Sequence, residues 1–141
     1  MTLIGAFLLA MLSNSSPSQP VKVEMKGVTA GILYEAPIVG GHLPELAGKY
    51  RRRITEITIA PGGHVGEHIH RGPGIRNMTE GRMNSIMPDK SVVYSSGDYF
   101  FEVSHRVVND SGKVCKHLLF QILPEEVEGP SLIPARNRSP H

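Results

Sequence analysis

His68 and His70 are the residues whose type and spacing most directly suggest chemistry. Side chains two positions apart in a β-strand point to the same face of the sheet, so both imidazoles can face one interior. Imidazole pairs of this kind bind divalent transition metals. The sequence therefore predicts a site for one ion, Fe, Mn, Zn, Ni or Cu, and does not choose among them. The alternative is a pair of ordinary core and rim histidines.

His105, in a later strand-like segment, is the candidate third ligand. Three protein ligands leave coordination positions for water and substrate, which is typical of a catalytic rather than a structural metal. His64 has the same parity as His68, but an extended strand would separate the two by roughly 13 Å, too far to share an ion. Glu102 and Tyr99 are candidates for moving a proton.

Arg76 is predicted to face inward by alternation from the two histidines. A guanidinium inside a barrel is costly unless it is paired. Pairing with Glu102 or Glu56 is the structural interpretation. The functional interpretation is that Arg76 binds a carboxylate or phosphate of a ligand, because its planar fork suits anions of that shape.

Short alternating segments separated by Gly, Pro, Asn and Asp predict an all-β fold, a sandwich or a closed barrel. The predicted break at Pro61–Gly63 precedes the histidine pair, and Gly72–Gly74 follows it. Tyr99, Phe100, Phe101 and Phe120 are expected in the core, and His117 on the surface. The expected strands are 21–25, 32–34, 54–59, 65–70, 75–78, 83–87, 91–94, 99–103, 106–108 and 114–123.

These residues resemble the two sequence motifs of the cupin superfamily. Gly62, His68, His70 and Gly81 resemble the first motif, and Gly97, His105 and Asn109 the second. The run 70–74 is similar to a subgroup of small bacterial cupins. The glutamate ligand of the first motif falls at Gly74 or Ile75, which cannot coordinate through their side chains. The segment from Gly97 to His105 is also three residues shorter than the family pattern, so its turn could deliver His105 to the pocket or rotate it away.

The resemblance implies a cupin-type jelly-roll β-barrel, with His68, His70 and His105 as metal ligands. It also implies an enzyme acting on a small oxygenated or anionic molecule, with oxygenase, isomerase or lyase chemistry left open. Arg76, Glu102 and Tyr99 are the catalytic candidates. The alternative is a non-catalytic cupin module that binds a small ligand or serves as an accessory subunit. Cupins often pair through an edge strand, so a homodimer is expected.

The composition and the two ends of the chain limit which partners the protein binds and where in the cell it is located. A net charge of +2 argues against nucleic acid as a partner. The apolar run 3–12 is too short to span a bilayer as a helix and suits a secretory signal peptide. We expect an exported protein, periplasmic or membrane-associated, in which this segment could also contact a membrane or a protein complex. The predicted divisions are a signal-like or anchor segment at 1–20, a barrel at 21–124 and a C-terminal arm at 125–141.

Overall fold

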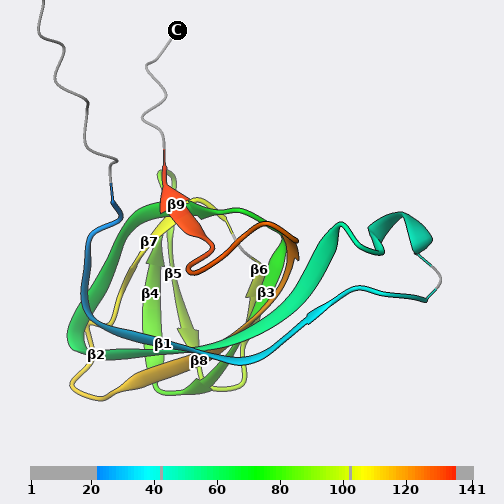
Figure 1. Ribbon diagram of the computed structural model, residues 1–141. Helices are drawn as coiled ribbons and strands as arrows, with labels where there is room; N and C mark the ends of the chain where they lie inside the picture. Colours follow the sequence, from blue (N-terminus) through cyan, green and yellow to red (C-terminus); the bar gives the residue numbers. More distant parts are fainter. Residues whose placement is uncertain (1–21, 42, 102, 136–141) are drawn as a thin grey trace, which may run out of the picture.

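The computed structural model describes residues 22–41, 43–101 and 103–135. The described chain forms one sheet that curls into a barrel, with a single short 3-10 turn at Pro44–Leu46 (Figure 1). This confirms the predicted all-β jelly-roll barrel. The strands are β1 (Met25–Pro37), β2 (Tyr50–His70), β3 (Gly74–Glu80), β4 (Arg82–Ile86), β5 (Ser91–Ser95), β6 (Tyr99–Phe101), β7 (His105–Val108), β8 (Cys115–Pro124) and β9 (Leu132–Pro134).

The long strand β2 organises the barrel because it pairs along both edges. One edge pairs first with β8 and then with β7, and the other pairs first with β1 and then with β9. The expected break at Pro61–Gly63 was wrong, since β2 runs through it. Gly62 takes a positive φ of 71° there, and a Cβ on Gly63 would lie 2.8 Å from the Ala60 carbonyl oxygen. Glycine therefore lets the strand bend without ending.

Alternation along the strands fills the barrel with apolar side chains. Burying one such side chain contributes about 1.5–3 kcal/mol. The buried core cluster comprises Ile57, Ile59, Val65, Met78, Met83, Phe100, Val107, Cys115 and Leu119. Burial raises the pKa of the Cys115 thiol to about 11, so this thiol is protonated at neutral pH.

The expectation for the aromatic residues was largely wrong. Phe100 is buried and stacks on Tyr94 with ring centroids 3.8 Å apart. Tyr99 and Phe101 are 70% and 73% exposed, and Phe120 is 40% exposed. The reason is the alternation of side chains along a strand, because the residues on either side of an inward-facing residue must face outward.

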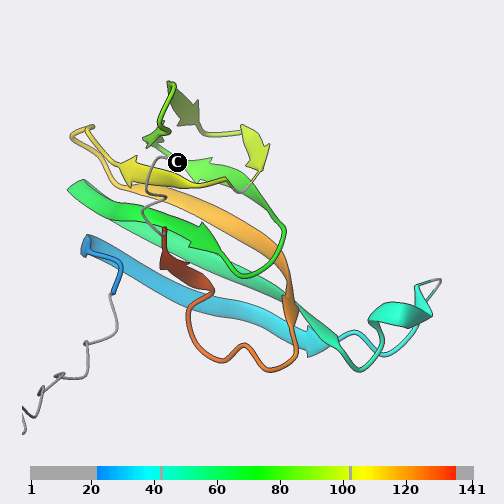
Figure 2. The same ribbon diagram turned by 90° about the horizontal axis from the view of Figure 1, so that it is seen from above.

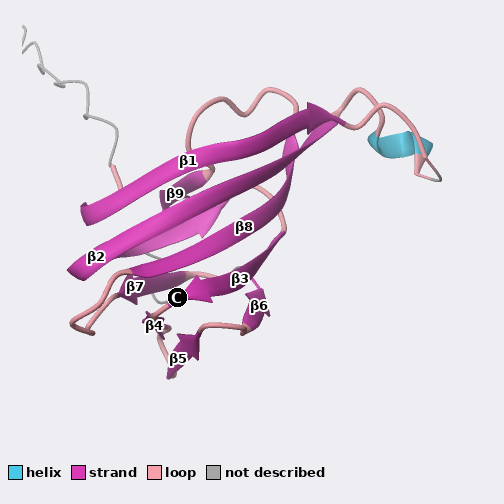
Figure 3. Cartoon of the chain, turned by 90° about the horizontal axis from the view of Figure 1, so that it is seen from below, coloured by secondary structure: helices cyan, strands magenta, loops and turns pink. Residues whose placement is uncertain are grey.

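The predicted C-terminal arm begins as part of the fold. Within residues 125–135, Val127 is 3% exposed, Ser131 is 6% exposed, and β9 adds to the edge of β2. Figure 2 shows β1 and β2 continuing past the barrel into a projecting hairpin, and Figure 3 shows β1, β2 and β8 side by side. The signal-like segment 1–20 lies outside the described residues, so export remains a prediction. Within the described part of the chain, no helix is long and apolar enough to cross a membrane.

Candidate metal centre

The structure brings His68, His70 and His105 together, as predicted. Each offers one ligand nitrogen, and these three atoms all lie within 4.8 Å of one another. His68 and His70 are presented by β2, and His105 lies directly opposite His68 in the pairing of β2 with β7. His68 and His105 are 2% and 1% exposed. The shorter second motif therefore still delivers His105 to the pocket.

Hydrogen bonds on two of the rings fit a metal site. Nδ1 of His68 lies 2.7 Å from the Gly66 carbonyl oxygen, which can only accept, so Nδ1 carries the proton and Nε2 the lone pair. Nδ1 of His105 lies 2.7 Å from the Ser85 hydroxyl, a hydrogen bond that orients that ring. Bonds of this type fix the tautomer and the orientation of metal-binding histidines. The donor set of three imidazoles suits the predicted transition metals.

Arg76 lies where alternation from the histidines predicted it, 4% exposed on the inner face of β3. One guanidinium nitrogen lies 3.3 Å from Nε2 of His70, and another contacts Nε2 of His117. The prediction of His117 on the surface was wrong, because this residue is 0% exposed. His117 lies two positions from both Cys115 and Leu119 on the same strand, and this alternation could have predicted that it faces the interior.

The other catalytic candidates lie elsewhere or outside the described residues. The structure does not bring Tyr99 into the histidine cluster: it pairs with Asn77, one position from the inward Arg76, and faces outward. Glu102 lies outside the described residues, so its role remains a prediction. His64 contacts Glu24 at 3.1 Å, away from the cluster.

Two apolar cavities lie beside the ligands. One has a volume of about 220 Å³ and is bordered by His70, Arg76, Ile57, Leu119 and residues 129–132, among others. A smaller cavity of about 60 Å³ is bordered by His68, Arg76 and His117. A mostly apolar cavity with a few polar groups at one end is the usual form of a small-molecule site.

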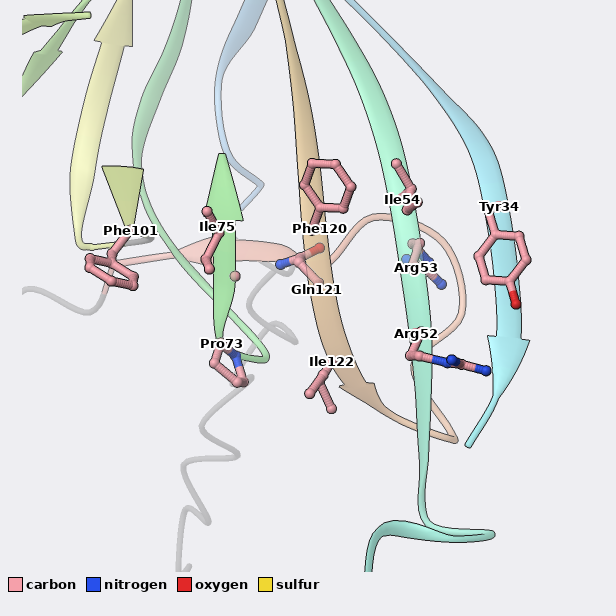
Figure 4. Close-up of a pocket in the computed structure, with 11 residues that line it drawn as sticks. Tyr34, Arg52, Arg53, Ile54, Pro73, Ile75, Phe101, Phe120, Gln121 and Ile122 are labelled. Carbon is pink, nitrogen blue, oxygen red and sulfur yellow. The ribbon is translucent and has the colours of Figure 1, made fainter. Parts of the chain in front are cut away.

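A third and larger cavity lies on the outer face of the sheet, away from the histidines. It has a volume of about 680 Å³ (Figure 4). Its wall contains one row of directly opposed residues that crosses five strands: Tyr34, Ile54, Phe120, Ile75 and Phe101. Phe101 and Phe120 in this row were expected in the core, but they form part of an exposed surface.

Comparison with solved structures identifies the fold. The chain is similar to the polyketide cyclase RemF from Streptomyces resistomycificus, with a TM-score of 0.56 and 21% identity over 89% of this chain and 86% of that one. It is also similar to a cupin-2 domain protein from Rhodospirillum rubrum, with a TM-score of 0.53 and 16% identity over 89% and 74% of the two chains. This barrel is a cupin fold.

A cupin domain from Bordetella pertussis Tohama I gives a further match, with a TM-score of 0.51 and 19% identity over 70% of this chain and 96% of that chain. No protein-family model and no curated protein matches the sequence. Similarity at these identities concerns the fold, and the clustered histidines carry the argument for chemistry.

Proposed function

We propose that this cupin is a metal-dependent enzyme that acts on a small oxygenated molecule held beside His70. The observation that carries the proposal is the meeting of three histidine nitrogens within 4.8 Å, with His70 also bordering the apolar cavity of about 220 Å³. An ion held by His68, His70 and His105 would have open positions toward that cavity's contents.

Each residue has a defined role in this proposal. The bound metal would supply Lewis acidity or oxygen binding. The three histidines would hold it, and Ser85 and the Gly66 carbonyl orient two of their rings. The apolar wall excludes water from the bound molecule, which strengthens electrostatic interactions there. Arg76 borders the same cavity and places a positive charge where an anionic group or a developing negative oxygen would lie.

The reaction class stays broad. The similarity to a protein described as a polyketide cyclase supports placing oxygenated ring compounds first among candidate substrates. The apolar lining supports the same choice, because it favours a mostly uncharged molecule. Oxygenase, isomerase and lyase chemistry all remain compatible with a three-histidine site.

Elemental analysis of the purified protein tests the proposal. We expect about one equivalent of a transition metal in the wild type and its loss in the double variant His68→Ala/His70→Ala. His64→Ala is the matched control, because His64 lies on β2 but points toward Glu24. Wild-type protein that stays free of metal after loading would exclude the metalloenzyme, and equal metal loss in the control would contradict the assignment of the ligands to His68, His70 and His105.

A second candidate function is docking, and the outer apolar face favours it. Phe101, Phe120 and Ile75 are 73%, 40% and 45% exposed within one continuous row. We propose that a second copy of this chain covers this face. Within the described residues β1 pairs with β2 only. The other edge of β1 therefore borders this face and is open to pairing with another strand. Antiparallel pairing of β1 with its own copy would place the same surface on both sides of a two-fold axis.

A further inference from the structure

The C-terminal strap, residues 125–135, passes directly beside the candidate metal ligands. Its strand β9 pairs antiparallel with β2, so that Leu132 lies opposite His70 and Pro134 opposite His68. Directly opposed residues in an antiparallel pair project to the same face, with Cβ atoms about 4.5–5.5 Å apart. The side chain of Leu132 therefore stands next to the imidazole of His70, on the face that carries the cluster.

Leu132 also borders both inner cavities. It contributes to the wall of the cavity of about 220 Å³ that includes His70, and to the wall of the cavity of about 60 Å³ that includes His68. Leu132 thus lies at the boundary between the spaces in front of two metal ligands. Shortening this side chain would enlarge both spaces at once and bring them together.

Buried hydrogen bonds hold the strap in position. Arg53, 3% exposed, donates to the carbonyl oxygens of Gly129 and Val127 at 2.5 and 3.1 Å. The Ser131 hydroxyl donates to Oε1 of Gln121 at 2.8 Å, and both residues are buried. These bonds fix the backbone immediately before Leu132, so the position of its side chain is set by the fold rather than by the ligand.

We propose that Leu132 determines the size of the ring compound that reaches the metal centre. The inference rests on the proposed function, because it takes the cavity beside His70 as the substrate pocket. A dry apolar cavity of about 150 Å³ holds a benzene-sized ring. The cavity beside His70, at about 220 Å³, is therefore sized for a small ring system, and Leu132 limits the addition of further rings.

A series of phenols that grows by one ring tests this. Phenol, 2-naphthol and 2-hydroxyanthracene are titrated into the full-length protein by calorimetry, and metal content is measured on the same samples. Leu132→Ala should improve binding of 2-hydroxyanthracene relative to phenol by about tenfold or more. Leu132→Phe should shift the preference the other way and weaken 2-naphthol. Ile133→Ala is the matched control: Ile133 lies opposite Ile69, so it projects to the other face of the same short strand.

The outcomes separate this inference from the proposed function. Opposite shifts in the two Leu132 variants, with Ile133→Ala within about twofold of the wild type, would support it. Equal size preference in Leu132→Ala and Ile133→Ala would overturn it, as would the absence of ring binding in every protein. If the phenols bind in the expected order but the protein holds no metal, the role of Leu132 in limiting ring size is supported and the metalloenzyme proposal fails.

Discussion

His105 lies directly opposite His68 in the antiparallel pairing of β2 and β7, and the centroids of the two imidazole rings are 4.7 Å apart. Because opposed side chains share a face, this register places the third ligand beside the first pair. The register brings a residue 37 positions away in sequence onto the face that His68 and His70 share.

Ser85 is expected to tune metal affinity through His105. Its buried hydroxyl lies 2.7 Å from Nδ1 of that ring, and loss of such a partner typically weakens metal binding about 10- to 100-fold. Competition of the Ser85→Ala variant against a chelator measures the effect. Ser91→Ala is the control, because Ser91 is exposed and its hydroxyl bonds Asn84 instead. Equal affinities in the two variants would contradict the role of Ser85.

Arg76 is expected to oppose metal binding. Its guanidinium lies 3.3 Å from Nε2 of His70 and, as a donor only, engages the lone pair of that nitrogen. Its positive charge also repels a divalent ion. Arg76→Gln should therefore raise metal affinity about tenfold or more, measured by the same competition. Arg106→Gln, on the exposed side of β7, is the control. Weaker binding in Arg76→Gln would show that the guanidinium supports the site instead.

Glu35 is expected to make stability depend on acid pH. Its hydrogen bond with Arg53, together with the charges of Arg53 and Arg51, holds the pKa of the carboxyl below its ordinary value of 4.5. The ionised form is thus favoured by folding. Its stabilising contribution is present above pH 4.5 and is lost as the pH falls below it toward the folded-state pKa. Arg53 also holds the strap, so the loss should reach residues 125–135.

Thermal unfolding of the wild type and Glu35→Gln between pH 7 and pH 3 tests this dependence. The wild type should unfold at the higher temperature at pH 7, and the difference should shrink below pH 4.5. Glu45→Gln, an exposed change on the 3-10 turn, should leave the curve unchanged. A difference in unfolding temperature that grows as the pH falls would contradict the lowered pKa of Glu35.

The outer apolar row is expected to hold a homodimer together. Phe101→Ser/Phe120→Ser removes two exposed aromatic side chains from that row, and aromatic residues that anchor an interface typically contribute about 2 kcal/mol or more each. Light scattering after size exclusion should report a dimer for the wild type and a monomer for this variant. Val93→Ser, an exposed change on β5, should stay dimeric. A monomeric wild type would leave this face to another partner.

The local sequence predicted the shared face of the two candidate ligands, but it predicted less about the residues that surround them. The two-residue spacing of His68 and His70 sufficed to predict a shared face, because strand geometry fixes that relation without reference to the rest of the chain. The inward position of Arg76 followed from the same alternation across the turn at Gly72–Gly74. The barrel itself followed from many short alternating segments and from the cupin-like motifs.

The pairing of the strands depends on contacts between distant parts of the chain. His117 and Leu132 border the inner cavities because β8 is central in the sheet and β9 returns to the edge of β2, and no local pattern encodes either pairing. The same holds for the outer row from Tyr34 to Phe101, in which Phe101 and Phe120 had been expected in the core. Alternation shows that neighbouring residues in a strand face opposite sides of the sheet. Which side becomes the interior depends on how the sheet closes.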